Sequence, residues 1–283
     1  MKIVSLTKKN SGGVLLLGGF DGMHLGHRQL LLRAKESGKA VGVSVILGNK
    51  GEPLYTARER KELFFELEAD YFVELPFEEI RALSAQEFLS LLERELAPEA
   101  YICGEDFRFG YGASGDGETL KRYAPVPVSV EPLLYIGGEK VGSGKIKALL
   151  AEGKIKQANA LLGRNFFLLG EVERDRQVGN EIGFPTANIR YPKEKFPLKI
   201  GVYQTLVAVD GKEYKAITNF GARPTFENGE VWTETHLLDF NGDLYGKTLS
   251  VSFVKYLREV KKFESVEALK EQLKKDKEYA RTH

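Results

Sequence analysis

The sequence predicts an α/β first half followed by a small antiparallel β-barrel that carries a terminal helix. Strand-like and helix-like segments alternate up to about residue 130, which is typical of a parallel sheet with right-handed crossovers. From Asn165 the pattern changes to strands separated by turn signals, and 264–279 returns to helix. With 283 residues the chain is long enough for two domains, which we expect over 1–160 and 161–283.

The composition excludes several classes of protein. Apolar residues make up 42% of the chain and charged residues 29%, with a net charge of +1, so no basic surface for nucleic acid is expected. No apolar run approaches the roughly 20 residues that span a bilayer, and the start lacks a signal-peptide core. A single cysteine, Cys103, cannot form an intramolecular disulfide. We therefore expect a cytoplasmic protein with neither a nucleic-acid nor a membrane partner.

The first half reads as a doubly wound sheet, with strands and helices in turn. Two helices begin with capping boxes, Thr56 with Glu59 and Ser84 with Glu87. The strands are expected at 14–17, 41–47, 71–75 and 101–103, and the helices from Met23 to about Gly38, at 56–67 and at 84–96.

A helical stretch over 146–162, interrupted at Gly153, precedes the second half. Three dipeptides are strong hairpin signals there: Asp210-Gly211, Asn228-Gly229 and Asn241-Gly242. The strands are expected at 166–172, 201–209, 214–218, 231–240 and 249–253.

The first strand runs into a glycine-rich turn, Gly18-Gly19-Phe20-Asp21-Gly22-Met23-His24-Leu25-Gly26-His27. Backbone N–H groups and the helix dipole at such a junction favour an anion. If the helix begins at Met23, both histidines lie on one face near its start, where they suit phosphate chemistry. The alternative is a helix-capping or metal-binding pair, although only Asp21 lies close enough to add a metal ligand.

This stretch resembles the Gly-Phe-Asp-Gly-x-His-x-Gly-His signature of the nucleotidylyltransferases. It is most similar to the adenylyltransferase half of the bacterial bifunctional riboflavin kinase/FMN adenylyltransferases. The resemblance implies a Rossmann-like first domain in which His24 and His27 contact phosphates during adenylyl transfer. It also implies nucleotide contacts from Gly18, Phe20 and Asp21.

A second element of this resemblance, Gly104–Gly110, follows a strand end, where ligands gather in open α/β sheets. It matches Gly-x-Asp-Phe-Arg-Phe-Gly, which implies nucleotide contacts from Asp106 and Arg108. For Phe107 and Phe109 we favour structural packing.

A third element, Val141–Lys147, occupies the place of the Ile-Ser-Ser-Thr-x-Ile-Arg pattern. Ser143 is retained, whereas Gly142, Gly144 and Lys147 replace the usual serine, threonine and arginine. The resemblance assigns Ser143 and Lys147 to nucleotide binding, and Lys147 keeps the charge without the planar fork of arginine.

In the second half, Pro185-Thr186-Ala187-Asn188 matches the Pro-Thr-Ala-Asn element of riboflavin kinases. Hydroxyl and carboxamide oxygens are hard ligands that suit Mg²⁺ on a nucleotide, so Thr186 and Asn188 are expected to bind both. The alternative is an Asx or Ser/Thr turn between strands.

Glu234-Thr235-His236 matches the Glu-x-His strand of the same kinases. The resemblance makes Glu234 the base for the primary hydroxyl of riboflavin, because an alcohol is a poor nucleophile until a carboxylate takes its proton. A solvated strand carboxylate is the alternative. For His236 we favour a packed residue.

Two arginines and a glycine loop complete the resemblance. Arg223, in a Gly-x-Arg-Pro-Thr-Phe loop, and Arg258 are expected to bind flavin, with an ordinary ion pair as the alternative for Arg258. Gly179 is expected to contact the nucleotide. Its loop carries Asp175 and Asn180 where the pattern has glycine and arginine, and Arg174 or Arg176 is positioned to substitute.

The sequence therefore predicts a bifunctional enzyme. It would phosphorylate riboflavin to FMN with ATP and Mg²⁺, and then adenylylate FMN to FAD with release of pyrophosphate. Two alternatives remain at this point. One is a nucleotidylyltransferase for another phosphorylated acceptor with a non-catalytic flavin-binding barrel, and the other is a flavin-binding regulator without turnover.

Overall fold

The computed structural model describes residues 4–5, 12–48, 51–174, 186–222 and 230–282. The chain forms two compact units, Met1–Ser143 and Gly144–His283. Within the described ranges, no helix combines the length and the apolar character needed to cross a lipid bilayer.

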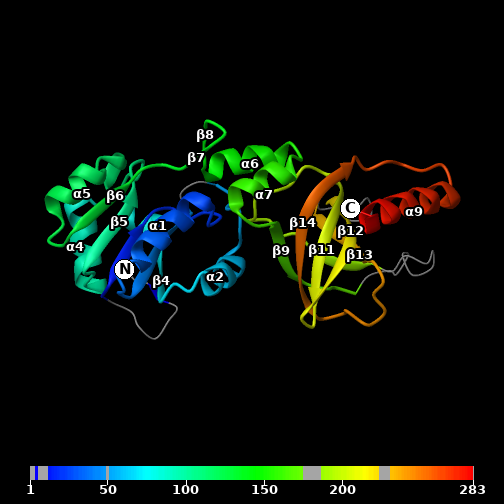
Figure 1. The fold of residues 1–283 in the computed structure, drawn as a ribbon, viewed down its shortest axis with the longest axis horizontal. Coiled ribbons are helices and arrows are strands. Elements are labelled where there is room, and N and C mark those ends of the chain that lie inside the picture. Colours follow the sequence, from blue (N-terminus) through cyan, green and yellow to red (C-terminus); the bar gives the residue numbers. More distant parts are fainter. Residues whose placement is uncertain (1–3, 6–11, 49–50, 175–185, 223–229, 283) are drawn as a thin grey trace. The chain divides into compact units, whose positions relative to one another are not determined.

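The first unit contains a six-stranded sheet in the order β1-β4-β3-β2-β5-β6 (Figure 1). Its strands are β1 Val4–Ser5, β2 Val14–Leu17, β3 Val41–Leu47, β4 Tyr71–Pro76, β5 Ala100–Gly104 and β6 Val128–Glu131. Strands β2 to β6 pair in parallel, and β1 pairs antiparallel with β4. The predicted parallel sheet is confirmed.

The order of these strands fixes where a ligand can bind. The chain builds outward through β2, β3 and β4, and then crosses back to add β5 and β6 on the other side of β2. In such sheets ligands bind at the carboxyl ends of the two strands where the direction reverses. Here these strands are β2 and β5, which pair as far as Leu17 and Cys103.

Helices cover both faces of this sheet (Figure 1). Helices α4 and α5 pack Phe88, Leu92 and Leu120 into one core with Leu15 and Leu17 of β2. Both predicted capping boxes are present, at the starts of α2 and α4. The helices are α1 Leu25–Lys35, α2 Ala57–Glu66, α3 Phe77–Ile80, α4 Ala85–Leu96 and α5 Gly117–Tyr123, with a 3₁₀ turn at Tyr111–Ala113 and a hairpin of β7 Tyr135–Ile136 and β8 Glu139–Lys140.

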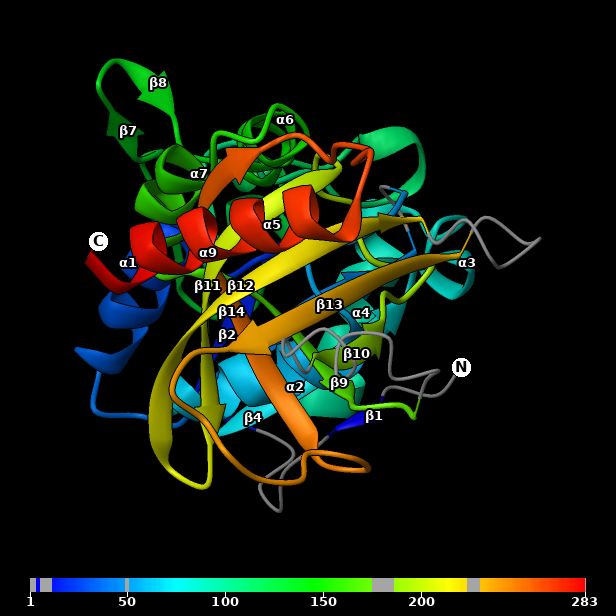
Figure 2. The ribbon, with the colours of Figure 1, turned by 90° about the vertical axis from the view of Figure 1, so that its right-hand side faces the viewer.

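The second unit is a nearly closed antiparallel barrel in the order β10-β13-β12-β11-β14-β9 (Figure 2). Just beyond β9, the Glu173 N–H donates to the Asn188 carbonyl of β10 at 2.9 Å, which brings the two ends of the sheet together. Helix α9, Val266–Thr282, lies across the outside of the barrel. The strands are β9 Phe166–Glu171, β10 Ala187–Arg190, β11 Gly201–Val209, β12 Lys212–Ala222, β13 Val231–Leu237 and β14 Thr248–Arg258.

The three hairpin signals have different outcomes. Asp210-Gly211 is confirmed: it joins β11 to β12 with φ values of 49° and 80°, the left-handed pair of a type I′ turn. Asn241-Gly242 does not join a hairpin, because β13 pairs with β12 and β10, whereas β14 pairs with β11 and β9. Asn228-Gly229 lies outside the described residues.

Helices α6, Ser143–Ala151, and α7, Ile155–Leu162, are separated at Gly153 as predicted. Helix α7 is fixed to the barrel by Asn159. Its Nδ2 donates to the Phe253 carbonyl at 2.8 Å, and its Oδ1 accepts from the Phe166 N–H at 2.9 Å. This segment precedes the boundary expected near residue 160, yet it belongs to the second unit by its contacts.

Candidate active sites

The two histidines of the glycine-rich turn lie in contact at the start of α1. His24 is the N-cap residue rather than part of the helix, and its Nδ1 accepts from the His27 N–H at 3.4 Å. The two rings stack with centroids 3.7 Å apart, and Phe20 lies against the other side of His27 at 4.6 Å. The helix starts later than predicted because Met23 has a left-handed φ of 43°. Because His24 caps α1 through the backbone N–H of His27, the two imidazole rings are brought together.

Burial keeps the His24 imidazole neutral. The side chain is 7% exposed, and this desolvation lowers its pKa to about 4, although the carboxylates of Asp21 and Asp106 oppose the shift. Because Nδ1 accepts a hydrogen bond, the proton of the neutral ring is on Nε2. His24 thus offers an uncharged N–H donor, stacked on the His27 ring and within the field of Asp21, Asp106 and Lys140.

The loops after β2 and β5 meet at the predicted edge of the sheet. Asp106, two residues beyond β5, accepts from Lys140 of the β7–β8 hairpin, with 2.5 Å between Oδ2 and Nζ. The charges of both residues act on His24, so they lie near the histidine pair. Lys140 was not among the predicted site residues. The one feature of the sequence that points to Lys140 is its position directly before the Val141–Lys147 element.

The other predicted residues of the histidine turn shape its backbone. Oδ1 of Asp21 accepts from the Leu54 N–H at 2.7 Å, which ties the turn to the segment after β3. Phe20 is fully buried with a φ of 42°, and a Cβ on Gly18 would lie 2.9 Å from its ring. These contacts hold the loop in its shape.

In the loop after β5, Phe107 and Phe109 belong to the hydrophobic core, as the sequence favoured. Arg108 is exposed and donates from Nη1 to the carbonyls of Phe107 at 2.8 Å and Glu105 at 3.3 Å. Its guanidinium therefore lies along its own loop.

The Val141–Lys147 element is divided between the two units. Ser143 is half-buried and begins α6 at the end of the first unit. Lys147 belongs to the second unit, where its Nζ lies 5.6 Å from the ring centroid of Phe196. The contact of Lys147 with the Phe196 ring is therefore made within the second unit.

In the barrel, a row of polar side chains crosses three neighbouring strands. Asn188 of β10 pairs with Glu234 of β13, which pairs in turn with Asn219 of β12. Residues paired directly across antiparallel strands point to the same face of a sheet. Glu234 therefore lies between two carboxamides, and Nδ2 of Asn219 is 3.5 Å from its Oε2.

Both flanking carboxamides have a buried oxygen that no described group satisfies. Asn188 is 6% exposed, and neither its Oδ1 nor that of Asn219 has a hydrogen-bond partner among the described residues. Buried acceptors are normally paired, because desolvation without a hydrogen bond is costly. These two oxygens fit a cation or a donor from a ligand, and the half-buried Thr186 lies two residues before Asn188.

The same row continues to Arg258 on β14. Asn219 pairs with Val202 of β11, which pairs with Arg258. Val202 packs against Ala280 of α9, so this is the outer face of the barrel. The guanidinium of Arg258 binds Asp276 of α9, with Nη2 2.6 Å from Oδ2, and the two side chains are only 16% and 7% exposed. Asp276 is thus the partner that the ion-pair alternative for Arg258 requires.

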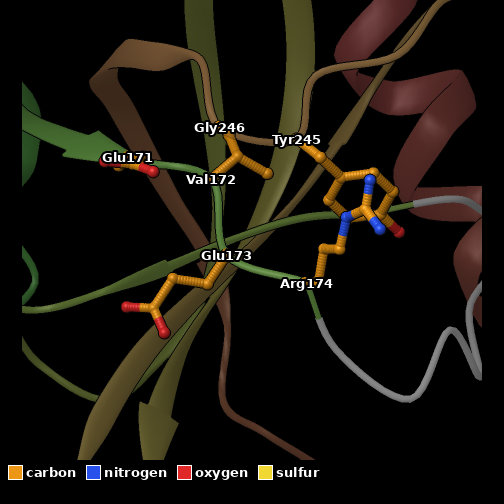
Figure 3. Close-up of a pocket in the computed structure, with 6 residues that line it drawn as sticks. All are labelled: Glu171, Val172, Glu173, Arg174, Tyr245 and Gly246. Carbon is orange, nitrogen blue, oxygen red and sulfur yellow. The ribbon is translucent and has the colours of Figure 1, made fainter.

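A pocket of about 470 Å³ lies where the end of β9 meets the segment that leads into β14 (Figure 3). The Arg174 guanidinium faces the Tyr245 ring, with 5.6 Å from Cζ to the ring centroid. The pocket adjoins Asn188 through the backbone of Glu173. Its lining residues are Glu171, Val172, Glu173, Arg174, Tyr245 and Gly246. A cation over an aromatic ring suits a nucleotide. Gly179 and Arg223 lie outside the described residues.

Comparison with known proteins matches both halves. A family model described as FAD synthetase matches residues 6–145, and one described as riboflavin kinase matches 162–283. A bifunctional riboflavin kinase/FMN adenylyltransferase from Pseudomonas fluorescens is 34% identical, over 98% of this chain and 94% of its own. Another, from Escherichia coli strain K12, is 32% identical over 95% and 92%.

A solved structure also matches along the whole chain. A crystal structure from Streptococcus pneumoniae, described as a macrolide-efflux protein, is 27% identical with a TM-score of 0.87, over 98% of this chain and 99% of that one. Together with the two relatives, this shows that both units recur in the same order along one polypeptide. The chain belongs to the family of bifunctional riboflavin kinase/FMN adenylyltransferases, the ATP-dependent transferases that make FMN from riboflavin and FAD from FMN.

Proposed function

We propose that the chain carries out its two reactions at the two groups of residues described above. Adenylyl transfer takes place at the edge of the parallel sheet, in a domain of residues 1–160, and riboflavin phosphorylation on the outer face of the barrel, in a domain of residues 161–283. The supporting observation is the convergence of motifs that are distant in sequence. Asn188 and Glu234 meet in one row, and His24 lies near Asp106.

In adenylyl transfer, a phosphate oxygen of FMN attacks the α-phosphorus of ATP and pyrophosphate leaves. The protein mainly positions two polyanions and stabilises the charge on their oxygens. His24 donates its Nε2–H to a phosphate oxygen, and the N-terminus of α1 adds its dipole. His27 contributes a second imidazole, and Gly18, Phe20 and Asp21 shape the nucleotide-binding turn.

Lys140 and Asp106 act together at this edge. When ATP binds, Lys140 moves to the phosphates, and the carboxylate of Asp106 becomes available to a ribose hydroxyl. Their 2.5 Å ion pair supports this exchange, because both side chains are about half exposed and such pairs are easily broken. Arg108, Ser143 and Lys147 remain proposed nucleotide contacts that rest on the motifs alone.

In riboflavin phosphorylation, Glu234 takes the proton of the primary hydroxyl while the hydroxyl oxygen attacks the γ-phosphorus of ATP, whose bond to the β-phosphate oxygen breaks to release ADP. Thr186 and Asn188 hold Mg²⁺, which when bound offsets the negative charge of the phosphates. The unsatisfied buried Oδ1 of Asn188 supports this assignment, since it is an oxygen ligand without a described partner.

The nucleotide of the kinase reaction binds in the pocket beside Arg174 and Tyr245. Arg174 supplies there the positive charge that Asn180 lacks relative to the family pattern. Gly179 is the remaining nucleotide contact, and Arg223 and Arg258 are the proposed flavin contacts.

We place the enzyme in the cytoplasm. The proposal is supported by its only cysteine, Cys103, which is free and buried. Burial raises the pKa of the Cys103 thiol to about 11, so the thiol is protonated and unreactive in a reducing compartment.

Two variants test the separation of the sites. The unchanged protein, supplied with riboflavin, ATP and Mg²⁺, forms FMN and then FAD. His24→Ala is expected to stop at FMN, whereas Glu234→Gln is expected to leave riboflavin unchanged and still convert added FMN to FAD. Chromatography of the flavins reads out both. If either folded variant loses both reactions, each assayed with its own supplied substrate, or if Glu234→Gln still phosphorylates riboflavin at the full rate, the proposal is contradicted.

A further inference from the structure

We propose that Asn219 of β12 is a positioning residue for the carboxylate of Glu234 in riboflavin phosphorylation. The inference rests on the proposed role of Glu234 as the base, and it adds a residue to which the sequence gave no role. Asn219 lies two residues before the Gly-x-Arg-Pro-Thr-Phe motif that contains Arg223, but only the strand register places it beside Glu234.

The contact is a donor facing an acceptor across two strands. Nδ2 of Asn219 lies 3.5 Å from Oε2 of Glu234, at the long end of a hydrogen bond. The last torsion of a glutamate side chain has a broad energy profile, so the carboxylate turns freely unless a neighbour fixes it. A donor on one carboxylate oxygen holds the plane of the group and directs the other oxygen towards the substrate hydroxyl.

The strands that carry this pair are themselves fixed from inside the barrel. Thr218 and Thr235, each next to a member of the pair, are fully buried and joined by a 3.0 Å hydrogen bond between their hydroxyls. Thr205 of β11 extends this chain, 2.8 Å from Thr218. Because a shift of one residue would break this buried chain, the register that sets Asn219 opposite Glu234 is strongly specified.

The carboxamide of Asn219 differs from a purely structural one. Asn159 uses both ends of its carboxamide, with three hydrogen bonds to Asn165, Phe166 and Phe253. Asn219 has a buried Oδ1 without a described hydrogen-bond partner and a single long contact through Nδ2. An asparagine selected for stability alone would satisfy that oxygen. Asn219 is instead arranged around Glu234 and whatever binds beside it.

The experiment compares Asn219→Asp and Asn219→Ser with the unchanged protein. Aspartate keeps the shape of asparagine but removes the donor and sets a second carboxylate beside Glu234. Serine keeps a smaller donor. We expect Asn219→Asp to lower kcat for riboflavin phosphorylation about tenfold to a hundredfold, the range for losing a hydrogen bond to a charged group, with KM for ATP within about twofold. Asn219→Ser is expected to retain more of kcat than the aspartate variant.

A double-mutant cycle separates positioning from a structural role. Glu234→Asp keeps a carboxylate but withdraws it from Asn219, so adding Asn219→Ser to it is expected to lower kcat by no more than about twofold. Losses that multiply in the double variant, or an unchanged kcat in Asn219→Asp, overturn the inference.

Two controls complete the experiment. Asn159→Ser is expected to lower the melting temperature without changing kcat for the folded enzyme, and the far-ultraviolet circular dichroism spectrum with the melting temperature reports on folding of the barrel in every variant. If Glu234→Gln keeps full kinase activity, the proposed base is wrong and the positioning role falls with it. If only Asn219→Asp keeps full activity, the base stands and the positioning role alone is wrong.

Discussion

The two proposed sites of this chain are assembled by different features of its fold. The site in the first unit lies in loops, where β2 and β5 end side by side and bring His24 and Asp106 to one edge. The site in the second unit lies within strands, where antiparallel register aligns Asn188, Glu234 and Asn219. The geometry of a site in loops depends on helix caps and turn conformations, whereas the geometry of a site in strands depends on strand pairing. The two sites are therefore sensitive to different substitutions.

The largest expected effect comes from the strand site. Asn188→Ala removes the buried Oδ1 that is proposed to bind Mg²⁺, so riboflavin phosphorylation should fall about a hundredfold, while adenylylation of added FMN stays unchanged. Initial rates of the two reactions, measured separately, give the comparison. The control is Arg190→Lys, at the exposed end of the same strand. Equal loss of both reactions in Asn188→Ala would contradict a separate kinase site.

A smaller effect, with the opposite selectivity, is expected at the loop site. Lys140→Ala removes the cation beside Asp106, so adenylyl transfer should fall about tenfold to a hundredfold with little change in phosphorylation. The matched control is Lys121→Ala, which breaks an exposed pair with Glu118 in the same unit. If both lysine variants behave alike in the FMN adenylylation assay, Lys140 has no role at that site.

Stability should depend on pH through His24. Its folded pKa of about 4 lies below the ordinary histidine value of 6.5, so between these values the unfolded chain binds a proton that the folded chain does not. The resulting contribution to the free energy of unfolding, about 3 kcal/mol, is complete above pH 6.5 and is lost as the pH falls towards 4.

The matched variant for this prediction is His24→Asn, which keeps a capping side chain but cannot titrate. The free energy of unfolding, measured by denaturant titration at pH 7.5 and pH 5, should fall less in the variant than in the unchanged protein. An identical fall in both proteins would show that His24 is not buried in its neutral form.

The smallest expected effect is at Gly26. A Cβ there would lie 3.3 Å from Nδ1 and Cε1 of the His24 ring, so Gly26→Ala should tilt the imidazole and lower adenylyl transfer a few fold. Phosphorylation and melting temperature should change little, because alanine favours the first turn of α1. A steady-state measurement of FMN adenylylation is sufficient, and an unchanged rate would show that the ring has room to move.

A feature of the fold could be predicted from the sequence where the interactions that determine it join residues close together in the chain. The capping boxes at Thr56 and Ser84 involve residues three apart, and both are present. The Asp210-Gly211 turn was predicted correctly because its φ values are set by the residues themselves. Asn241-Gly242 has the same kind of turn-forming sequence, but the strands before and after it, β13 and β14, pair with other strands. No pattern of neighbouring residues indicates which strands pair.

The site residues divide in the same way. Asn188 and Glu234 are predicted from motifs, whereas the place of Asn219 beside Glu234 follows only from the register of β12 and β13. Lys140 reaches Asp106 because a hairpin carries it back across the sheet edge, over a separation of 34 residues. The start of α1 was placed too early because the left-handed φ of Met23 is set by the buried loop around it, and helical periodicity does not show this.

The two proposed sites are expected to work independently within one chain. The most direct measurement mixes equal amounts of His24→Ala and Glu234→Gln and supplies riboflavin, ATP and Mg²⁺. The first variant should release FMN and the second should adenylylate it, so the mixture should form FAD although neither protein does so alone. A mixture that forms no FAD, while each variant retains its own single reaction with supplied substrate, would contradict independent sites.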